Sequence, residues 1–222
     1  MDNRFQADLA RLYDQRFAPA QEYRRRIWRV LVKIVFQQLV PETGTVLDLG
    51  CGYGEFINAI RARQKFGLDL NPDSQRRLSP EITLFQQDCS QRWPLADGRL
   101  DVVFTSNFFE HLQDKAALGR TLQEAFRCLK TGGRLIALGP NIRFTGGRYW
   151  DFWDHCLALT EASLAEGLIL HGFQIEQCRA RFLPYTMTRA PHYPLWVLAA
   201  YLRIPFLWRF FGQQFLIIAT KP

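Results

Sequence analysis

Three glycines at alternate positions follow a short apolar segment in the first quarter of the chain. The segment TVLDL covers residues 45–49, and Gly50, Gly52 and Gly54 come directly after it. Glycine lets a backbone turn sharply and approach a ligand without interference from a Cβ atom. Because Glu55 follows the third glycine, the spacing differs from the GxGxxG pattern of a dinucleotide site. The pattern predicts a ligand site that is not built for a pyrophosphate, with a tight turn that binds nothing as the alternative.

Two histidines could exchange a proton with a substrate. His111 lies in FFEHL and His155 in WDFWDHC, where Asp151 and Asp154 are close in the chain. A histidine near a carboxylate can act as a base near neutral pH. We predict that His155 is the base, oriented by Asp154 or Asp151, with His111 as the alternative base. Purely structural roles for both histidines stay open.

Apolar segments that read as strands alternate with amphipathic segments that read as helices. The expected strands are 45–49, 65–70, 82–88, 100–107, 134–140, 173–182 and 213–222, and the expected helices are 21–39, 54–63, 113–130 and 160–171. This alternation predicts a mostly parallel α/β sheet with helices on both faces. Ligands of such sheets bind beyond the carboxyl ends of the strands, where the glycines and His111 fall.

An insertion of residues 183–212 separates the last two expected strands. It mixes aromatic and basic side chains, namely Tyr193, Trp196, Tyr201, Arg203, Trp208, Arg209, Phe210 and Phe211. Such a mixture suits a cap over the site, a membrane interface or a subunit contact. We therefore divide the chain into an N-terminal helical segment, 1–40, and one α/β domain, 41–222, that contains the insertion.

Charge and cysteine content indicate in which compartment the protein works and which kinds of partner it has. The net charge is +7, and five cysteines occur without a CxxC pair. We expect a cytoplasmic protein with reduced thiols and no membrane-spanning helix. Peripheral contact with the inner face of a membrane stays open, because Arg24–Lys33 is strongly basic. Without a zinc-finger or RNA-binding signature we expect no nucleic-acid partner. The oligomeric state is left open.

The motif DLGCGYG, followed nineteen residues after Gly50 by Asp69, resembles the class I methyltransferases that use S-adenosylmethionine (SAM). The resemblance runs from about residue 42 to residue 140, and the whole chain resembles uncharacterised bacterial members of the class. It implies a Rossmann-like, seven-stranded, mostly parallel sheet with N-terminal helices and an insertion before the last strand. SAM is the implied cofactor.

The resemblance also implies which residues hold SAM. Asp69 would accept hydrogen bonds from the ribose hydroxyls, and Asp88 from the adenine amine. The backbone of Cys89 would face the adenine ring, and that of Asn107 would line the methionine half. The full expected cofactor set is Asp48, Gly50, Cys51, Gly52, Gly54, Asp69, Leu70, Asp88, Cys89 and Asn107.

Some members of the family hold a divalent metal with a Glu-His pair like that in FFEHL. We expect no metal, because Asn107 stands where another acid would be wanted. The predicted activity is methyl transfer from SAM to an oxygen or nitrogen of a small-molecule or lipid-linked acceptor, with glycan and glycolipid pathways in view. A SAM-binding regulator or partner subunit is the alternative. An NAD-dependent reductase is disfavoured by Glu55 and by the absence of a YxxxK pair.

Overall fold

A single seven-stranded sheet organises the molecule. The computed structural model describes residues 20–185 and 192–222, so residues 1–19 of the expected N-terminal segment 1–40 lie outside the described residues. The strands are β1 (Thr45–Leu49), β2 (Gln64–Asp69), β3 (Ile82–Gln86), β4 (Leu100–Ser106), β5 (Leu129–Pro140), β6 (Gln174–Arg179) and β7 (Gln214–Thr220). Their order is β3-β2-β1-β4-β5-β7-β6. β1 to β5 are parallel, and β7 is antiparallel to both of its neighbours. The predicted Rossmann-like, mostly parallel sheet is confirmed.

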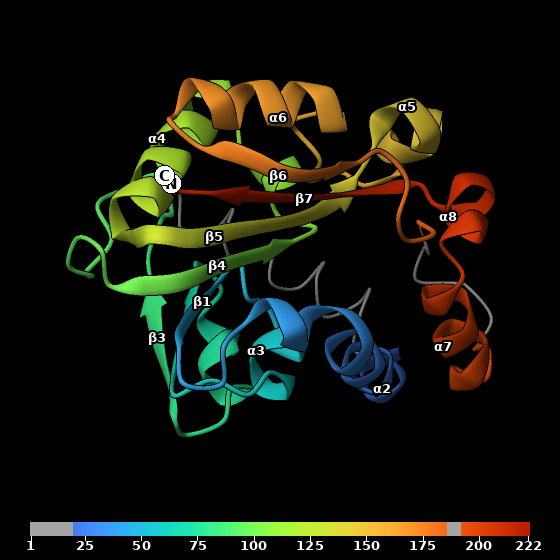
Figure 1. Cartoon of the computed structure of the whole chain (residues 1–222), viewed down its shortest axis with the longest axis horizontal. Coiled ribbons are helices and arrows are strands. Elements are labelled where there is room, and N and C mark those ends of the chain that lie inside the picture. The colour runs from blue at the N-terminus through green and yellow to red at the C-terminus, as the bar shows by residue number, and fades with distance from the viewer. Residues whose placement is uncertain (1–19, 186–191) are drawn as a thin grey trace.

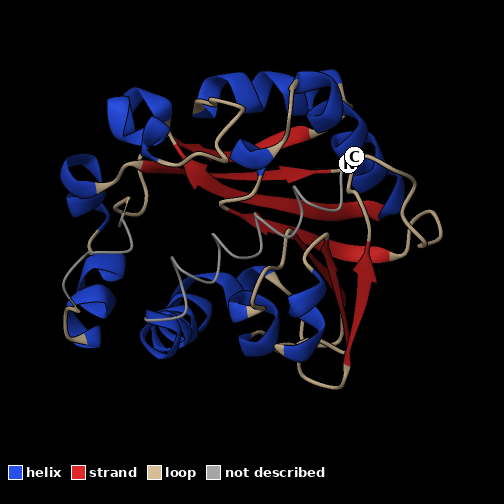
Figure 2. Cartoon of the chain, turned by 180° about the vertical axis from the view of Figure 1, so that it is seen from behind, coloured by secondary structure: helices blue, strands red, loops and turns tan. Residues whose placement is uncertain are grey.

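Helices cover both faces of the sheet (Figures 1 and 2). α4 (Lys115–Cys128) and α6 (Glu161–Leu170) lie on one face, and α2 (Gln21–Leu31) and α3 (Glu55–Ala59) on the other. Each face has its own apolar core. Leu118, Leu122 and Leu164 belong to one cluster, while Leu31, Phe36 and Phe56 belong to the second. The described part of the N-terminal segment therefore shares a core with the sheet.

Two helices differ in detail from the sequence pattern. The expected helix 21–39 is helical throughout, but it changes from α2 to a π-helical turn at Val32–Phe36 and a 3₁₀ turn at Gln37–Leu39. The expected helix 54–63 ends at Ala59, because Ile60 adopts an extended conformation and buries its side chain in the second core cluster.

The insertion forms two short helices, α7 (Leu195–Arg203) and α8 (Pro205–Phe211), with residues 186–191 outside the described part. Pro205 starts α8, since proline is accepted in the first helical turn. β6 ends at Arg179 opposite Leu216, and β7 begins at Gln214 opposite Pro140, the end of β5. The insertion therefore leaves and rejoins the sheet at its carboxyl edge, where α7 packs beside α2 (Figure 1). Among the described residues, no helix has the length and apolar character to cross a membrane.

Candidate active site

The alternating glycines form a tight loop, the donor loop (residues 50–54), at the carboxyl end of β1. Gly50, Gly52 and Gly54 have φ values of 71°, 49° and 73°, in the left-handed region that favours glycine. A Cβ atom at Gly50 would lie less than 3.0 Å from the ring of Phe108, which follows β4. The donor loop thus packs on the loop after β4, where the strand order of the sheet reverses.

Carboxylates flank the donor loop. The N–H of Gly52 donates to Oδ2 of Asp69 at 2.6 Å, and the N–H of Asn71 donates to Oδ1 at 2.8 Å. Burial raises the pKa of Asp48 well above its ordinary value, and the negative charges of Glu55 and Asp69 raise it further. Burial also raises the pKa of Asp69, although its backbone hydrogen bonds oppose that shift. The loop therefore offers an acidic and enclosed environment.

This set of groups fits SAM. The ligand carries a sulfonium and an ammonium, both cations, and its ribose hydroxyls are hydrogen-bond donors. A cation near mutually repelling carboxylates lowers their electrostatic energy. Glu55 already pairs with Arg24 of α2 at 2.9 Å, so Asp48 and Asp69 are the acids best suited to the ligand.

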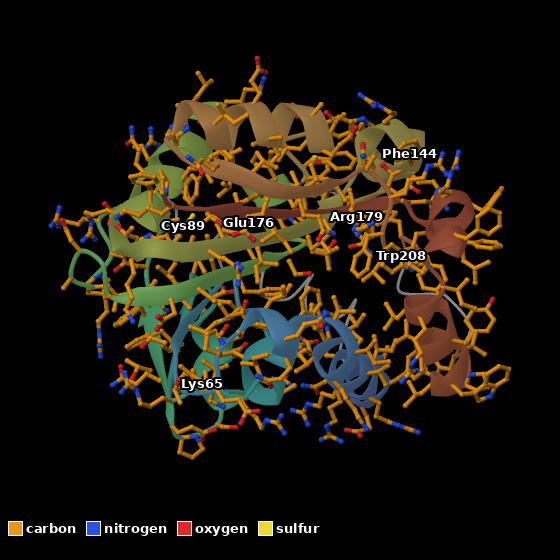
Figure 3. All side chains as sticks on the ribbon, in the orientation of Figure 1. Lys65, Cys89, Phe144, Glu176, Arg179 and Trp208 are labelled. Atoms are coloured by element: carbon orange, nitrogen blue, oxygen red, sulfur yellow. The ribbon has the colours of Figure 1, made fainter. Side chains whose placement is uncertain are left out.

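Asp88 and Cys89 form a turn directly after β3. The N–H of Ser90 donates to Oδ1 of Asp88 at 2.8 Å, and the indole N–H of Trp93 donates to the carbonyl of Cys89 at 2.8 Å. Burial raises the pKa of the Cys89 thiol to about 12, so the thiol carries no charge at neutral pH. Cys89 is labelled in Figure 3.

The loop after β4 turns sharply at Asn107. Its φ of 49° is the one positive value at a non-glycine residue in the described ranges, and its N–H donates to the carbonyl of Leu138 at 2.9 Å. The turn leads into Phe108 and the 3₁₀ turn Phe109–His111. The sheet thus brings the expected cofactor residues to one edge, at the ends of β1 to β4: Asp48, Gly50, Cys51, Gly52, Gly54, Asp69, Leu70, Asp88, Cys89 and Asn107.

Glu110, His111 and His155 meet at the same edge and form the acid–histidine cluster. One side-chain N or O atom of each residue lies within 4.8 Å of the others. His155 comes from the segment between β5 and α6. Its ring stacks on Phe152 at 4.9 Å and packs against Tyr149 at 4.6 Å, measured between ring centroids.

Backbone hydrogen bonds hold the two segments of the cluster together. The N–H groups of Cys156 and Leu157 donate to the carbonyl of Glu110 at 2.8 and 3.0 Å. The Glu110 side chain is 4% exposed, and burial raises its pKa to about 7, against the lowering effect of a charge on His111. Both histidines named by the sequence therefore lie in one cluster, together with the buried Glu110.

Asp154 pairs with His111, a contact that the sequence did not predict. Nδ1 of His111 lies 3.3 Å from Oδ2 of Asp154 and 3.1 Å from its carbonyl oxygen. We expected Asp154 or Asp151 to orient His155, and Asp151 is exposed. The observed contact joins residues 43 positions apart, which spacing along one loop cannot reveal.

The acid–histidine cluster lies beside the donor loop. The N–H of His111 donates to the carbonyl of Phe108 at 3.0 Å. Phe108, which lies over Gly50, directly precedes the turn that carries Glu110 and His111. A ligand held by Asp69 and a second substrate at the cluster would be neighbours.

Sequence comparisons agree on one family. A family model described as a methyltransferase domain matches residues 20–178. The 2-methyl-6-phytyl-1,4-hydroquinone methyltransferase of a Synechocystis species is 29% identical over 123 residues, which make up 52% of this chain and 38% of that protein. The dimethylglycine N-methyltransferase of Parasynechococcus marenigrum is 31% identical over 112 residues, 46% of this chain and 39% of that protein. The chain thus spans less than half the length of these curated relatives.

Solved structures share the fold over almost the whole chain. A SAM-dependent methyltransferase from Archaeoglobus fulgidus aligns with a TM-score of 0.66 at 20% identity and covers 99% of this chain and 100% of that one. A Haloferax volcanii protein described as a methyltransferase, in complex with the activator Trm112, aligns with a TM-score of 0.70 at 19% identity. The alignment covers 100% of this chain and 99% of that one. Fold, donor-site residues and the family match over most of the chain agree: the chain belongs to the class I SAM-dependent methyltransferases.

Proposed function

We propose that this enzyme transfers the methyl group of SAM to a hydroxyl oxygen of a lipid-linked acceptor. The observation that carries the proposal is the acid–histidine cluster beside the donor loop. SAM supplies the methyl group on a sulfonium. The acceptor oxygen attacks the methyl carbon, the carbon–sulfur bond breaks with its electrons going to sulfur, and the hydroxyl proton must leave.

Hydroxyl acceptors differ from carboxylates and neutral amines because a proton has to be removed from the attacking oxygen. A carboxylate or a neutral amine attacks without a base, whereas a hydroxyl usually needs one. The cluster contains two imidazole side chains, His111 and His155, and imidazole is the side chain that most often serves as a general base. A methyltransferase that acts on a neutral amine has no need of such groups next to its donor.

The cluster can be tested with single variants. His155→Ala and His111→Ala should each keep SAM affinity, because neither belongs to the donor loop, while turnover should fall about 10²–10⁴-fold as for loss of a general base. Labelled SAM with cell and lipid fractions supplies the assay, and Cys156→Ser, an exposed neighbour of His155, is the matched control. If neither histidine variant loses turnover, the acceptor is a carboxylate or a neutral amine and the hydroxyl proposal is wrong.

The lipid-linked acceptor is supported by the α7–α8 surface, which we define as Trp196, Arg203, Ile204, Phe206, Arg209 and Phe210. Trp196 is 72% exposed, and Phe206 and Phe210 are 64% and 61% exposed. The Phe206 and Phe210 rings lie 5.0 Å apart, measured between centroids, and exposed apolar side chains that lie together mark an interaction site more often than isolated ones. Aromatic rings mixed with arginines suit the headgroup region of an anionic membrane.

Position and charge both favour a bilayer as the occupant of this surface. The insertion lies at the carboxyl edge of the sheet, the same edge as the donor loop. The neighbouring α2 adds the exposed cations Arg26 and Arg29. At the base of the insertion, the Arg179 guanidinium lies 5.1 Å from the Trp208 ring (Figure 3). One curated relative is named for a hydroquinone that carries a phytyl chain.

Vesicle co-sedimentation tests this surface. Binding should be strong to vesicles with anionic lipid at low salt and should fall with added salt. Arg203→Gln and Arg209→Gln should each weaken it roughly fivefold, because a basic residue near an anionic surface contributes about 1 kcal/mol. Leu170→Ser, at a 79% exposed position on α6, is the control that should bind as the parent does. Indifference to lipid would assign the surface to a cap or a subunit contact.

A further inference from the structure

We infer that Glu110, His111 and His155 form a binding site for one divalent transition-metal ion. The sequence alone predicted no metal, because Asn107 replaces a second acid near the Glu-His pair. The structure adds His155 to that Glu-His pair. His155 enters from a segment 44 positions beyond His111, and the three residues converge.

The spacing of the three ligand atoms fits a single ion. They lie within 4.8 Å of one another. With bonds of about 2.1 Å in a tetrahedral arrangement, ligand atoms are about 3.4 Å apart. The longest separation in the cluster therefore has to shorten by up to about 1.4 Å when an ion binds, which requires the side chains of the cluster to rotate toward the ion.

The ligand types indicate which ions suit the site. Two imidazoles and one carboxylate are typical of zinc, iron and other first-row ions, and such sets leave further coordination positions open. Magnesium and calcium prefer sites made of oxygen atoms. We therefore assign the cluster to an ion such as Zn²⁺, Co²⁺, Mn²⁺ or Fe²⁺.

Outer contacts already orient the ligands. Asp154 faces Nδ1 of His111 with both its carboxylate and its carbonyl oxygen, which leaves Nε2 of that ring for a metal. A carboxylate behind the second nitrogen is the usual partner of a metal-binding histidine. The Phe152 and Tyr149 rings hold His155, and backbone hydrogen bonds to Glu110 tie the two segments together.

The role of the ion rests on the proposed function. A divalent cation lowers the pKa of a hydroxyl that it ligates and also positions it. An ion in this cluster would lie beside the donor loop, since the turn that carries Glu110 and His111 follows Phe108, whose ring lies against Gly50. With the ion bound, the cluster would prepare the acceptor hydroxyl through the ion, with the imidazoles as its ligands. Without the ion, the same imidazoles would serve as the base of the proposed function.

Metal binding can be measured without an acceptor. The full chain, treated with a chelator and dialysed, is titrated with Co²⁺ by visible absorption and with Zn²⁺ by calorimetry. We expect one ion per chain, without the charge-transfer band that a thiolate ligand gives. Glu110→Gln, His111→Ala and His155→Ala should each abolish this binding, and Asp154→Asn should weaken it about 10–100-fold.

Two controls and one parallel measurement make the result specific. His171→Ala removes a histidine at the end of α6, and Cys156→Ser removes the exposed thiol next to His155, so both should bind metal as the parent does. SAM affinity, measured in every variant, shows that the fold is intact. No Co²⁺ or Zn²⁺ binding by the parent, binding that survives the cluster variants, or binding that Cys156→Ser removes would each overturn the metal site.

The outcome separates the metal site from the proposed function. Methylation of a hydroxyl that persists in chelator, with no Co²⁺ binding, removes the metal and leaves the proposed function standing. If the protein binds metal but methylates only nitrogen, the metal site stands and the proposal of a hydroxyl acceptor is wrong.

Discussion

We expect the donor site to depend most directly on Asp69. If Asp69 accepts hydrogen bonds from the ribose hydroxyls, Asp69→Ala should weaken SAM binding, because each such charge-assisted bond contributes roughly 1.5–3 kcal/mol. The variant also loses the contact that restrains Gly52. Titration calorimetry measures the effect, with Asp73→Ala, an acid on the next turn of chain, as control. Unchanged affinity in a folded Asp69 variant would remove Asp69 from the site.

We expect the buried Asp48 beside the donor loop to lower the stability of the fold when its carboxyl group is ionised. Its pKa in the folded state is raised by burial and by Glu55 and Asp69. The folded state therefore holds the proton more tightly than the unfolded chain, and the free energy of unfolding falls as pH rises above the ordinary value of 3.8. Asp48→Asn cannot ionise, so it should be more stable than the parent at neutral pH.

Urea unfolding near pH 4 and near pH 8 checks this prediction for Asp48→Asn. The stability gain should be present near pH 8 and should shrink near pH 4, where the parent also carries a neutral side chain. A variant that is no more stable than the parent near pH 8 would contradict the assigned cause of the shift.

At the residue level, the positions of the donor-loop glycines and of Asp69 could be predicted, because a strand and its following turn place them at one edge of the sheet. Their contacts with SAM stay predictions. The pairing of Asp154 with His111 and the convergence of Glu110 with His155 could not be predicted in this way. These contacts depend on how two separate loops pack, and loop packing leaves no periodic pattern in the sequence.

At the level of elements, the contact between the donor loop and the loop after β4 can be tested through glycine. Gly50→Ala should lose about 1–2 kcal/mol from the positive φ and about 1–3 kcal/mol more from overlap with Phe108. Gly98→Ala is the matched control for the positive φ alone, because Gly98 has a φ of 62° but no atom within 4 Å of its Cβ position. Thermal unfolding should therefore rank Gly50→Ala as the less stable variant.

A second substitution isolates the overlap with Phe108. Gly50→Ala combined with Phe108→Ala should recover part of the lost stability relative to the sum of the single variants. Equal losses for Gly50→Ala and Gly98→Ala would mean that the two loops do not restrain each other.

Strands were easier to predict than helix ends and the insertion. Each expected strand overlaps an observed one, because most of the expected strands are short apolar runs bounded by turn residues, a pattern typical of buried strands. Helix α3 stops early because Ile60 gains more from burial in an extended conformation than from another helical turn. The insertion carries no regular period, so its division into α7 and α8 at Pro205 required the structure.

For the whole molecule, the alternation of strands and helices predicted the parallel part of the sheet but not the strand order. The seven-stranded arrangement came from the family resemblance. Nothing in the composition of the last two strands indicates that β7 lies between β5 and β6. That placement depends on long-range pairing, since β7 pairs with β5 from residue 134 onward.

The inner position of β7 matters while the chain is being made. A ribosome completes β5 and β6 before it reaches residues 214–220, and within the described sheet β6 pairs only with β7. Until β7 emerges, the long apolar edge of β5 stays without its partner, and exposed strand edges of this kind recruit other chains. The nascent protein therefore passes through a stage at which chaperones, or slow dilution during refolding, should decide how much of it reaches the native state.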